Sequence, residues 1–162
     1  MSTTSLMGGT GFVLGRYHQL YPQETHVECR EELHPHRDDV LYGISTVDNY
    51  WPLRGNLEMD IATNLTHLMR VLPHVKGTFS FLSSWFCYGS GSTITYPARE
   101  RDECRPTGVY SSTKLCAEQM VASYCSTRAA GLLDEGPSSY RILRLCNVIG
   151  VDPRAGKEKG AL

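Results

Sequence analysis

The chain has 162 residues, of which 41% are hydrophobic and 20% are charged, and its formal net charge is -1. This is enough apolar material for the core of one globular domain, and it excludes a disordered chain. The balanced charge argues against a nucleic-acid partner, and no segment approaches the ~20 apolar residues of a membrane span. Residues 1–5 lack the basic and apolar regions of a signal peptide, so we expect a cytoplasmic protein.

The first half of the chain predicts short strands around one helix. Residues 5–7 form a first strand, and a helix follows over residues 12–21, where Pro22 stops it. Residues 25–29 and 40–47 are then the next two strands, because both segments are rich in residues that favour strands.

The second half predicts two longer helices. Apolar residues at positions 57, 61, 65, 68, 69 and 72 have helical periodicity, and a strand begins at 79–82. A polar loop over 88–105 precedes a helix over 110–128 and a final strand over 139–148. This alternation predicts a parallel α/β sheet with helices on both faces.

A glycine-rich turn, Gly8-Gly9-Thr10-Gly11, connects the first predicted strand to the first predicted helix. In such a turn the backbone N–H groups can approach a pyrophosphate at the helix N-terminus. On this segment alone, an ordinary glycine-rich turn is an equal alternative.

Three further features could support chemistry. Tyr110 and Lys114 lie four residues apart, on one face of the predicted helix. A nearby ammonium lowers the pKa of a phenol, although most Tyr and Lys pairs at this spacing are a solvated Lys beside a half-buried Tyr. Ser84 and Asn147 follow strands, where open α/β sheets bind ligands, but Ser and Asn also cap strands and turns.

The cysteines and histidines predict neither a disulfide framework nor a metal site. No C-x-x-C pair is present, so we expect free thiols that mostly serve packing. His34 and His36 lie near Asp38 and Asp39, but Pro35 separates the histidines, and a solvated loop is the expected structure. The six cysteines are Cys29, Cys87, Cys104, Cys116, Cys125 and Cys146.

In their order and spacing, these motifs resemble the NAD-dependent epimerase/dehydratase family of the extended short-chain dehydrogenase/reductase superfamily, whose members act on nucleotide sugars. The resemblance also covers a D-x-N-like segment at residues 60–64 and an R-x-x-N-x-x-G strand at residues 144–150. It implies a Rossmann-like domain over residues 1–150 and a polar tail over residues 151–162. We therefore expect the family's substrate domain to be absent and the fold to be incomplete relative to the family.

The resemblance implies a role for each matching residue. Ser84, Tyr110 and Lys114 match the catalytic residues, and Ser84 and Asn147 would contact the substrate. The implied cofactor-binding residues are Gly8, Gly9, Thr10, Gly11, Phe12, Val13, Glu31, Ile44, Ser45, Tyr110 and Lys114.

The implied reaction is hydride transfer between a sugar carbon and nicotinamide. Dehydratases of the family usually carry an Asp-Glu pair directly after the catalytic Ser or Thr, where this chain has Trp85 and Phe86. Neither side chain can transfer a proton usefully, which favours an epimerase or a keto-sugar reductase. The alternative is a non-catalytic module, either truncated or cofactor-sensing.

The chain departs from the family in the region that would bind the cofactor. The third glycine of the fingerprint falls on Leu14, so we expect the first helix to sit slightly differently. Residues 15–39 have room for only one helix and one strand, which reduces that edge of the sheet. Glu31 favours NAD, which we expect as cofactor, whereas Arg30 would favour NADP, which stays possible. By resemblance, the helices opening near Leu57 and Tyr110 would form a homodimer interface.

Overall fold

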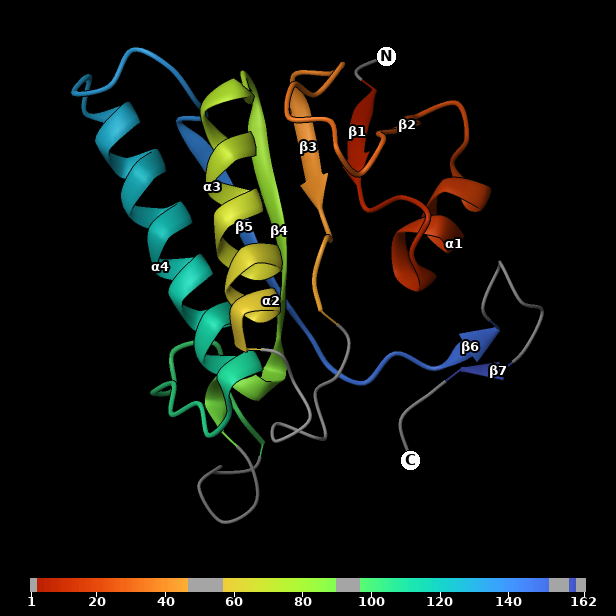
Figure 1. The fold of residues 1–162 in the computed structure, drawn as a ribbon, viewed down its shortest axis with the longest axis vertical. Helices are drawn as coiled ribbons and strands as arrows, with labels where there is room; N and C mark the ends of the chain where they lie inside the picture. Colours follow the sequence, from red (N-terminus) through yellow and green to blue (C-terminus); the bar gives the residue numbers. More distant parts are fainter. Residues whose placement is uncertain (1–2, 47–56, 90–96, 152–157, 160–162) are drawn as a thin grey trace.

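The structure is a computed structural model, and it describes residues 3–46, 57–89, 97–151 and 158–159. Figure 1 shows strands at the centre, with α2, α3 and α4 on one side and α1 beside β1 and β2. The strands are β1 (Thr4–Met7), β2 (Thr25–Val27), β3 (Asp39–Tyr42), β4 (Thr78–Ser84), β5 (Ser139–Leu145), β6 (Gly150–Val151) and β7 (Glu158–Lys159). The helices are α1 (Phe12–Leu20), α2 (Leu57–Ile61), the π-helical turn η1 (Ala62–Thr66), α3 (His67–Val71), the 3-10 turns η2 (Leu72–His74) and η3 (Trp85–Tyr88), and α4 (Val109–Ala129).

The five strands β1 to β5 form one parallel sheet in the order β2-β1-β3-β4-β5. The chain leaves β1 towards one edge and then returns to place β3 on the other side of β1. This reversal is the switch point at which parallel α/β sheets bind ligands, beyond the carboxyl ends of the strands. The predicted parallel α/β, Rossmann-like sheet is therefore confirmed.

The main core lies between the sheet and the helices α2 to α4. Alternate residues of β3 and β4, including Val40, Tyr42, Phe79 and Phe81, are fully buried on this face. They pack against the apolar stripe of the helices, which confirms the helical periodicity in the sequence. The helical members of this core are Leu68, Val71, Leu72, Ala117, Val121 and Cys125.

Helix α1 covers the opposite face of the sheet. Its buried residue Leu14 lies against Gly43 and Leu82, and Leu82 alternates with the core-facing Phe81 along β4. Helices therefore lie on both faces, as the strand–helix alternation predicts.

The connection from β2 to β3 has no helix and no strand. Residues 28–38 cross β1 on the face that carries α3, and Leu33 on this segment packs against the core. Within the described residues β2 is the edge of the sheet, so the expectation of a reduced edge is met.

The carboxyl-terminal segment differs from a simple polar tail. After β5 the chain continues to β6, which pairs with β7 in an antiparallel ladder of two residues each. Residues 152–157 and 160–162 of the expected tail lie outside the described part of the chain. Among the helices that the structure describes, none is long and apolar enough to cross a membrane.

Candidate functional site

The glycine-rich turn between β1 and α1 leaves no room for side chains. Gly8 has a φ of 91°, and a Cβ there would lie 3.1 Å from backbone atoms of Gly43 and Ile44. A Cβ on Gly9 would lie 2.8 Å from the γ carbons of Val27. Only glycine therefore fits these two positions, and the turn is held against the strands on both sides of β1.

The turn leads directly into the N-terminus of α1. Gly11 is the N-cap, and its N–H donates to the Gly8 carbonyl at 2.9 Å. The first turn of a helix has N–H groups without intrahelical acceptors and carries a partial positive charge, which suits an anion. No acidic residue lies in this first turn, and Thr10 is exposed. The predicted phosphate loop, Gly8 to Val13, therefore has the local structure that binding a pyrophosphate requires.

Leu14 occupies the position of the fingerprint's third glycine, and the structure compensates for it in β3's continuation. A Cβ on Gly43 would lie 2.7 Å from the Leu14 Cδ1 atom and 3.2 Å from Leu82 Cδ1. A glycine at position 14 would leave room for the strand. Here Gly43, opposite Leu14, leaves that room instead.

Three hydroxyl groups meet at the carboxyl end of β3 and β4. Ser84 ends β4, Ser45 follows β3, and both hydroxyls hydrogen-bond the phenol of Tyr110 in the first turn of α4. Ser84 also accepts a hydrogen bond from the Phe86 backbone N–H at 3.3 Å, which caps η3 and fixes the turn. Two predicted catalytic residues, Ser84 and Tyr110, are thus together with the predicted cofactor-binding residue Ser45.

Burial dominates the acidity of Tyr110. It raises the pKa of the phenol above its ordinary value, and the hydroxyls of Ser45 and Ser84 lower it by a smaller amount. Lys114 is not among the largest influences on this pKa. In this state of the protein Tyr110 is a protonated, hydrogen-bonded phenol.

Lys114 lies one helical turn after Tyr110 but turns into the protein. Its Nζ donates to the Leu82 carbonyl at 2.6 Å and lies 4.3 Å from the centroid of the Phe81 ring. The side chain is only 1% exposed, and burial lowers the pKa of Lys114 to about 8. Its predicted role of lowering the pKa of Tyr110 stays a prediction, and it requires the ammonium to leave Leu82.

Asn64 is a site residue to which the sequence analysis gave no role. It is 1% exposed and uses both ends of its amide: Oδ1 accepts from Ser45 Oγ and Thr46 N, and Nδ2 donates to Thr46 Oγ1 and Thr113 Oγ1. The distances are 3.2, 3.0, 3.0 and 3.0 Å. Because Asn64 lies in the π-helical turn η1, this turn joins the loop after β3 to α4, beside Tyr110.

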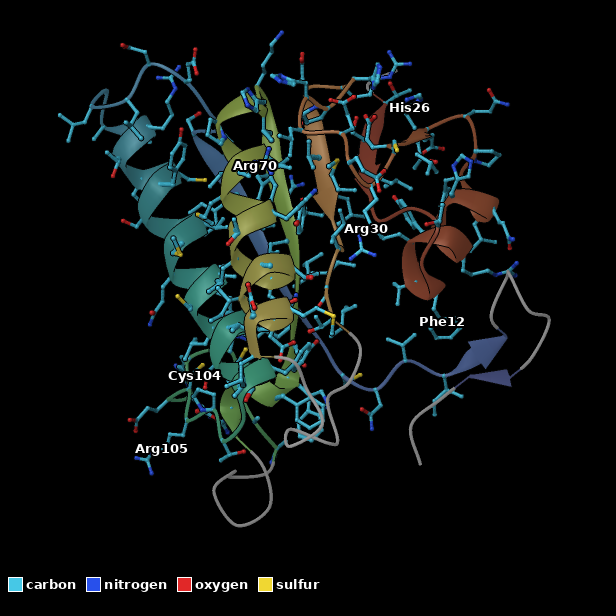
Figure 2. The ribbon with its side chains drawn as sticks, viewed as in Figure 1. Phe12, His26, Arg30, Arg70, Cys104 and Arg105 are labelled. Carbon is cyan, nitrogen blue, oxygen red and sulfur yellow. The ribbon has the colours of Figure 1, made fainter. Side chains whose placement is uncertain are left out.

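The segment after β5 runs along the same end of the sheet. Asn147 is exposed, and its Oδ1 accepts a hydrogen bond from Trp85 Nε1 at 3.3 Å, next to Ser84 in the chain. Three residues later, a Cβ on Gly150 would lie 3.7 Å from Phe12 at the start of α1, and Figure 2 shows Phe12 directed towards β6. Asn147 is therefore beside the predicted site, although its contact with a substrate stays a prediction.

A buried ion pair supports the floor of the site. Glu118 of α4 accepts from Arg144 Nη2 at 2.6 Å and from Arg144 Nε at 2.9 Å, and also accepts from Ser83 Oγ at 2.5 Å. Glu118 is 3% exposed, and its carboxylate raises the pKa of Arg144 above the ordinary value. The network holds α4, β4 and β5 together directly beside Ser84.

The residues expected to contact the adenosine ribose lie after β2. Glu31 is exposed, and the Cys29 thiol donates to its Oε2 atom at 2.8 Å, which lowers the pKa of Glu31. Arg30 is exposed, and its carbonyl lies 2.9 Å from His67 Nε2 of α3; Figure 2 labels it between β3 and α1 in that view. Both candidates for reading the ribose are thus exposed near the switch point.

A parallel sheet with a glycine-rich turn at its switch point and a Ser, Tyr and Lys set beyond its strands defines a nucleotide-binding α/β protein. The sequence profile of the NAD dependent epimerase/dehydratase family matches residues 54–161, two thirds of the chain. The chain belongs to this family. A search of curated proteins finds no match.

Solved structures have the same fold at low sequence identity. RMD from Pseudomonas aeruginosa, complexed with NADPH, has a TM-score of 0.76 and 18% identity over 94% of this chain. UDP-glucose 4-epimerase from Brucella ovis, in complex with NAD, has a TM-score of 0.75 and 18% identity over 99% of this chain. UDP-N-acetylglucosamine 4-epimerase from Methanobrevibacter ruminantium M1 has a TM-score of 0.74 and 16% identity over 99%. The chain spans only 56%, 57% and 60% of these three proteins, in that order.

Proposed function

We propose that the chain is the cofactor-binding part of an NAD(P)-dependent enzyme that acts on a nucleotide sugar, as an epimerase or a keto-sugar reductase. The observation that carries this proposal is the meeting of Ser84, Tyr110 and Ser45 at the end of the sheet that also holds the glycine-rich turn. Similar proteins bind NADPH or NAD, and UDP-sugar epimerases are among them.

The fit to a dinucleotide rests on the turn. The Gly8 and Gly9 backbone can approach a ligand because no side chain is there, and the N-terminus of α1 suits the pyrophosphate. When bound, the nicotinamide accepts hydride from the sugar carbon and can return it. All other parts of the reaction fall to side chains of the protein.

Tyr110 is the group that exchanges a proton with the substrate. As a phenolate it removes the proton of the sugar hydroxyl while hydride leaves the same carbon, and the keto product is bound by the Ser84 hydroxyl. In the reverse direction the Tyr110 phenol returns the proton to the oxygen. The Ser45 and Ser84 hydroxyls hydrogen-bond this phenol, and Ser84 would hold the reacting oxygen within hydrogen-bond reach of Tyr110.

Lys114 provides the charge that makes this proton transfer possible near neutral pH. Burial raises the pKa of Tyr110, so a phenolate needs a positive neighbour. With its Nζ moved from the Leu82 carbonyl to the ribose of the nicotinamide, Lys114 would supply that charge one turn from Tyr110. In that position Lys114 would lower the pKa of Tyr110 and so make it a better base.

The residues after Ser84 favour an epimerase or reductase over an elimination reaction. Trp85 and Phe86 stack with a centroid distance of 4.5 Å, and the Phe86 ring meets the Tyr110 ring edge-on at 6.5 Å. These rings provide an apolar wall and no acid or base for the loss of water. Glu31 supports NAD as the cofactor, and Arg30 keeps NADP as the second candidate.

A homodimer through α2 and α4 is part of the proposal. Leu57, Met59 and Ile61 of α2 and Met120 of α4 are each 39–55% exposed. Beside them an open hollow of about 920 Å³ lies between α2 and the first turns of α4. A second copy that presents the same apolar face would cover both, and we expect sedimentation equilibrium to give twice the monomer mass.

The free thiols, two of them buried, support a reducing compartment such as the cytoplasm.

The proposal is tested most simply by measuring turnover of a UDP-sugar, in a form of the protein that acts on UDP-sugars. We expect Tyr110→Phe to abolish conversion of the UDP-sugar, followed by the amount of product formed, while cofactor affinity changes little. Thr127→Ala, on the same helix and far from the turn of Tyr110, is the control. Unchanged turnover in Tyr110→Phe would refute the role of Tyr110. Cofactor binding without turnover on any nucleotide sugar would favour the alternative of a non-catalytic module.

A further inference from the structure

Two imidazoles and one buried carboxylate meet at the edge of the sheet. His26 lies on β2, Glu28 directly follows β2, and His36 lies on the segment that crosses to β3. Their ligand atoms all lie within 4.8 Å of one another. Figure 2 shows His26 near the amino-terminal ends of β1 and β2, away from the start of α1.

The Glu28 carboxylate is held with one oxygen towards the protein and the other towards the histidines. Oε1 accepts hydrogen bonds from the Ser5 hydroxyl and from the His36 backbone N–H, the latter at 2.8 Å. Oε2 lies 2.7 Å from His36 Nδ1 and 3.7 Å from His26 Nε2. An orienting hydrogen bond on the far oxygen of a carboxylate is the arrangement that supports metal ligands in proteins.

The cluster is built on one side and open on the other. The Glu28 side chain is 1% exposed, whereas those of His26 and His36 are 42% and 60% exposed. Ser5 is itself fully buried on β1, so the carboxylate has a fixed position. An ion could therefore reach the two imidazole nitrogens and Oε2 from solvent, with a further coordination position left for water.

We propose that His26, Glu28 and His36 bind a divalent transition-metal ion such as Zn²⁺ through His26 Nε2, Glu28 Oε2 and His36 Nδ1. Two histidines and one glutamate are a ligand set that zinc accepts in proteins, with water as the fourth ligand. The ion would replace the hydrogen bond between Oε2 and His36 Nδ1. This site lies on the face of β2 opposite Val27, which packs against Gly9, so it is separate from the phosphate turn.

The proposed ion would stabilise the edge of the sheet that β2 forms. The crossing segment 28–38 has no helix or strand of its own, and β2 pairs only with β1 in the part of the chain that the structure describes. A metal bound by β2 and by His36 would join the two ends of this segment. The sequence analysis predicted no metal, because Pro35 separates His34 from His36; it did not consider His26 and Glu28, which reach His36 only through the fold.

Cobalt is the probe that separates this site from the six thiols. We expect metal-free protein titrated with Co²⁺ alone to bind one equivalent, with visible bands of nitrogen and oxygen ligation and without thiolate charge transfer. His26→Ala and His36→Ala should each weaken this binding at least about tenfold. His34→Ala is the matched control, because His34 stacks on His74 outside the cluster and should leave binding unchanged.

The half-exposed histidines are the positions to change, since replacing Glu28 would also remove the contact to Ser5. Circular dichroism of each variant confirms that it is folded before the titration. Absence of Co²⁺ binding, binding with a thiolate spectrum only, or unchanged affinity in the His26→Ala/His36→Ala double variant would each overturn the proposal.

Discussion

At the scale of single residues, the candidate site contains side chains whose burial is costly. Lys114 is buried against an aromatic ring and a single carbonyl oxygen, and Glu118 and Arg144 form a largely buried ion pair. Burial of charge stabilises a fold poorly, and proteins often retain it where function needs it. Substitution of these residues should therefore change the stability of the protein whether or not a substrate is bound.

Lys114→Met should make the protein more stable at pH 7. Burial lowers the folded pKa of Lys114 from 10.5 to about 8, which corresponds to about 3 kcal/mol, and loss of the bond to the Leu82 carbonyl offsets about 1 kcal/mol. Between pH 8 and 10.5 the unfolded chain binds more protons at this residue, so its penalty disappears as the pH rises through that range. Urea unfolding of both proteins at pH 7 and 9.5 should show the advantage of the variant shrinking. An advantage that is absent at pH 7, or independent of pH, would contradict the burial of a charged Lys114.

Glu118→Gln should cost about 3 kcal/mol of unfolding free energy, because it leaves the Arg144 guanidinium without its carboxylate. Glu103→Gln is the matched control: it breaks an exposed pair with Arg105, for which we expect no measurable cost. Urea unfolding of both variants and the wild type at neutral pH measures these costs. Equal costs for the two substitutions would show that the Glu118 pair does not support the fold.

The positions of Ser84 and Tyr110 were predictable from the sequence, because their motifs fix the strand end and the start of the helix; their catalytic roles stay predictions. Ser84 and Tyr110 meet because both stand at the carboxyl end of the sheet, as their positions after a strand and at the start of a helix imply. Glu118 was not foreseen, because its partners lie on other elements; Asn64 ends the D-x-N-like segment, but its role as a link to Thr113 depends on the fold. The inward orientation of Lys114 also depends on packing that the sequence does not reveal.

At the scale of elements, the packing of α1 on the sheet depends on one leucine in the helix and one glycine opposite it. Leu14 stands where the family's third glycine is expected, and Gly43 makes room for it at the end of β3. The strand–helix order was predictable from punctuation and periodicity. This compensation was not, because residues 14 and 43 face each other only after the sheet has formed.

Gly43→Ala should destabilise the protein by about 1–3 kcal/mol, because the new methyl group meets Leu14 Cδ1. Its cost should fall by at least about 0.5 kcal/mol in a Leu14→Ala background, where that carbon is gone. A double-mutant cycle in urea measures this coupling. Additive effects of the two substitutions would mean that Gly43 does not accommodate Leu14.

The helix before β4 shows a second departure from regular geometry. The predicted helix over 57–72 is present, but the π-helical turn η1 interrupts it and carries Asn64 in its middle. Such turns occur frequently at functional sites, and this one links the loop that contains Ser45 to α4. Apolar periodicity predicts the helix and gives no sign of the extra residue in one turn.

At the scale of the whole molecule, the chain corresponds to only part of the solved structures that share its fold. The sheet, the glycine-rich turn and the Ser84, Tyr110 and Lys114 set are all within the described residues, whereas the solved relatives are considerably longer. Leu143 of β5 and Ile149 after it are 41% and 77% exposed, so apolar surface remains at the edge opposite β2. The glycine-rich turn and Tyr110, which we propose to bind the dinucleotide, are among the described residues, so this binding is the central claim to test.

Isothermal titration with NAD and NADP tests that claim most directly, on the wild-type chain and on two variants that add the same charge. Thr10→Glu places a carboxylate on the exposed corner of the phosphate turn, and Gln23→Glu places one in the turn after α1, at the other end of the strands. We predict that the wild type binds at least one of the two dinucleotides. Thr10→Glu should weaken this binding about tenfold or more by like-charge repulsion, and Gln23→Glu should leave it unchanged. No heat with either dinucleotide at millimolar concentration, or equal affinity in Thr10→Glu and the wild type, would contradict the account.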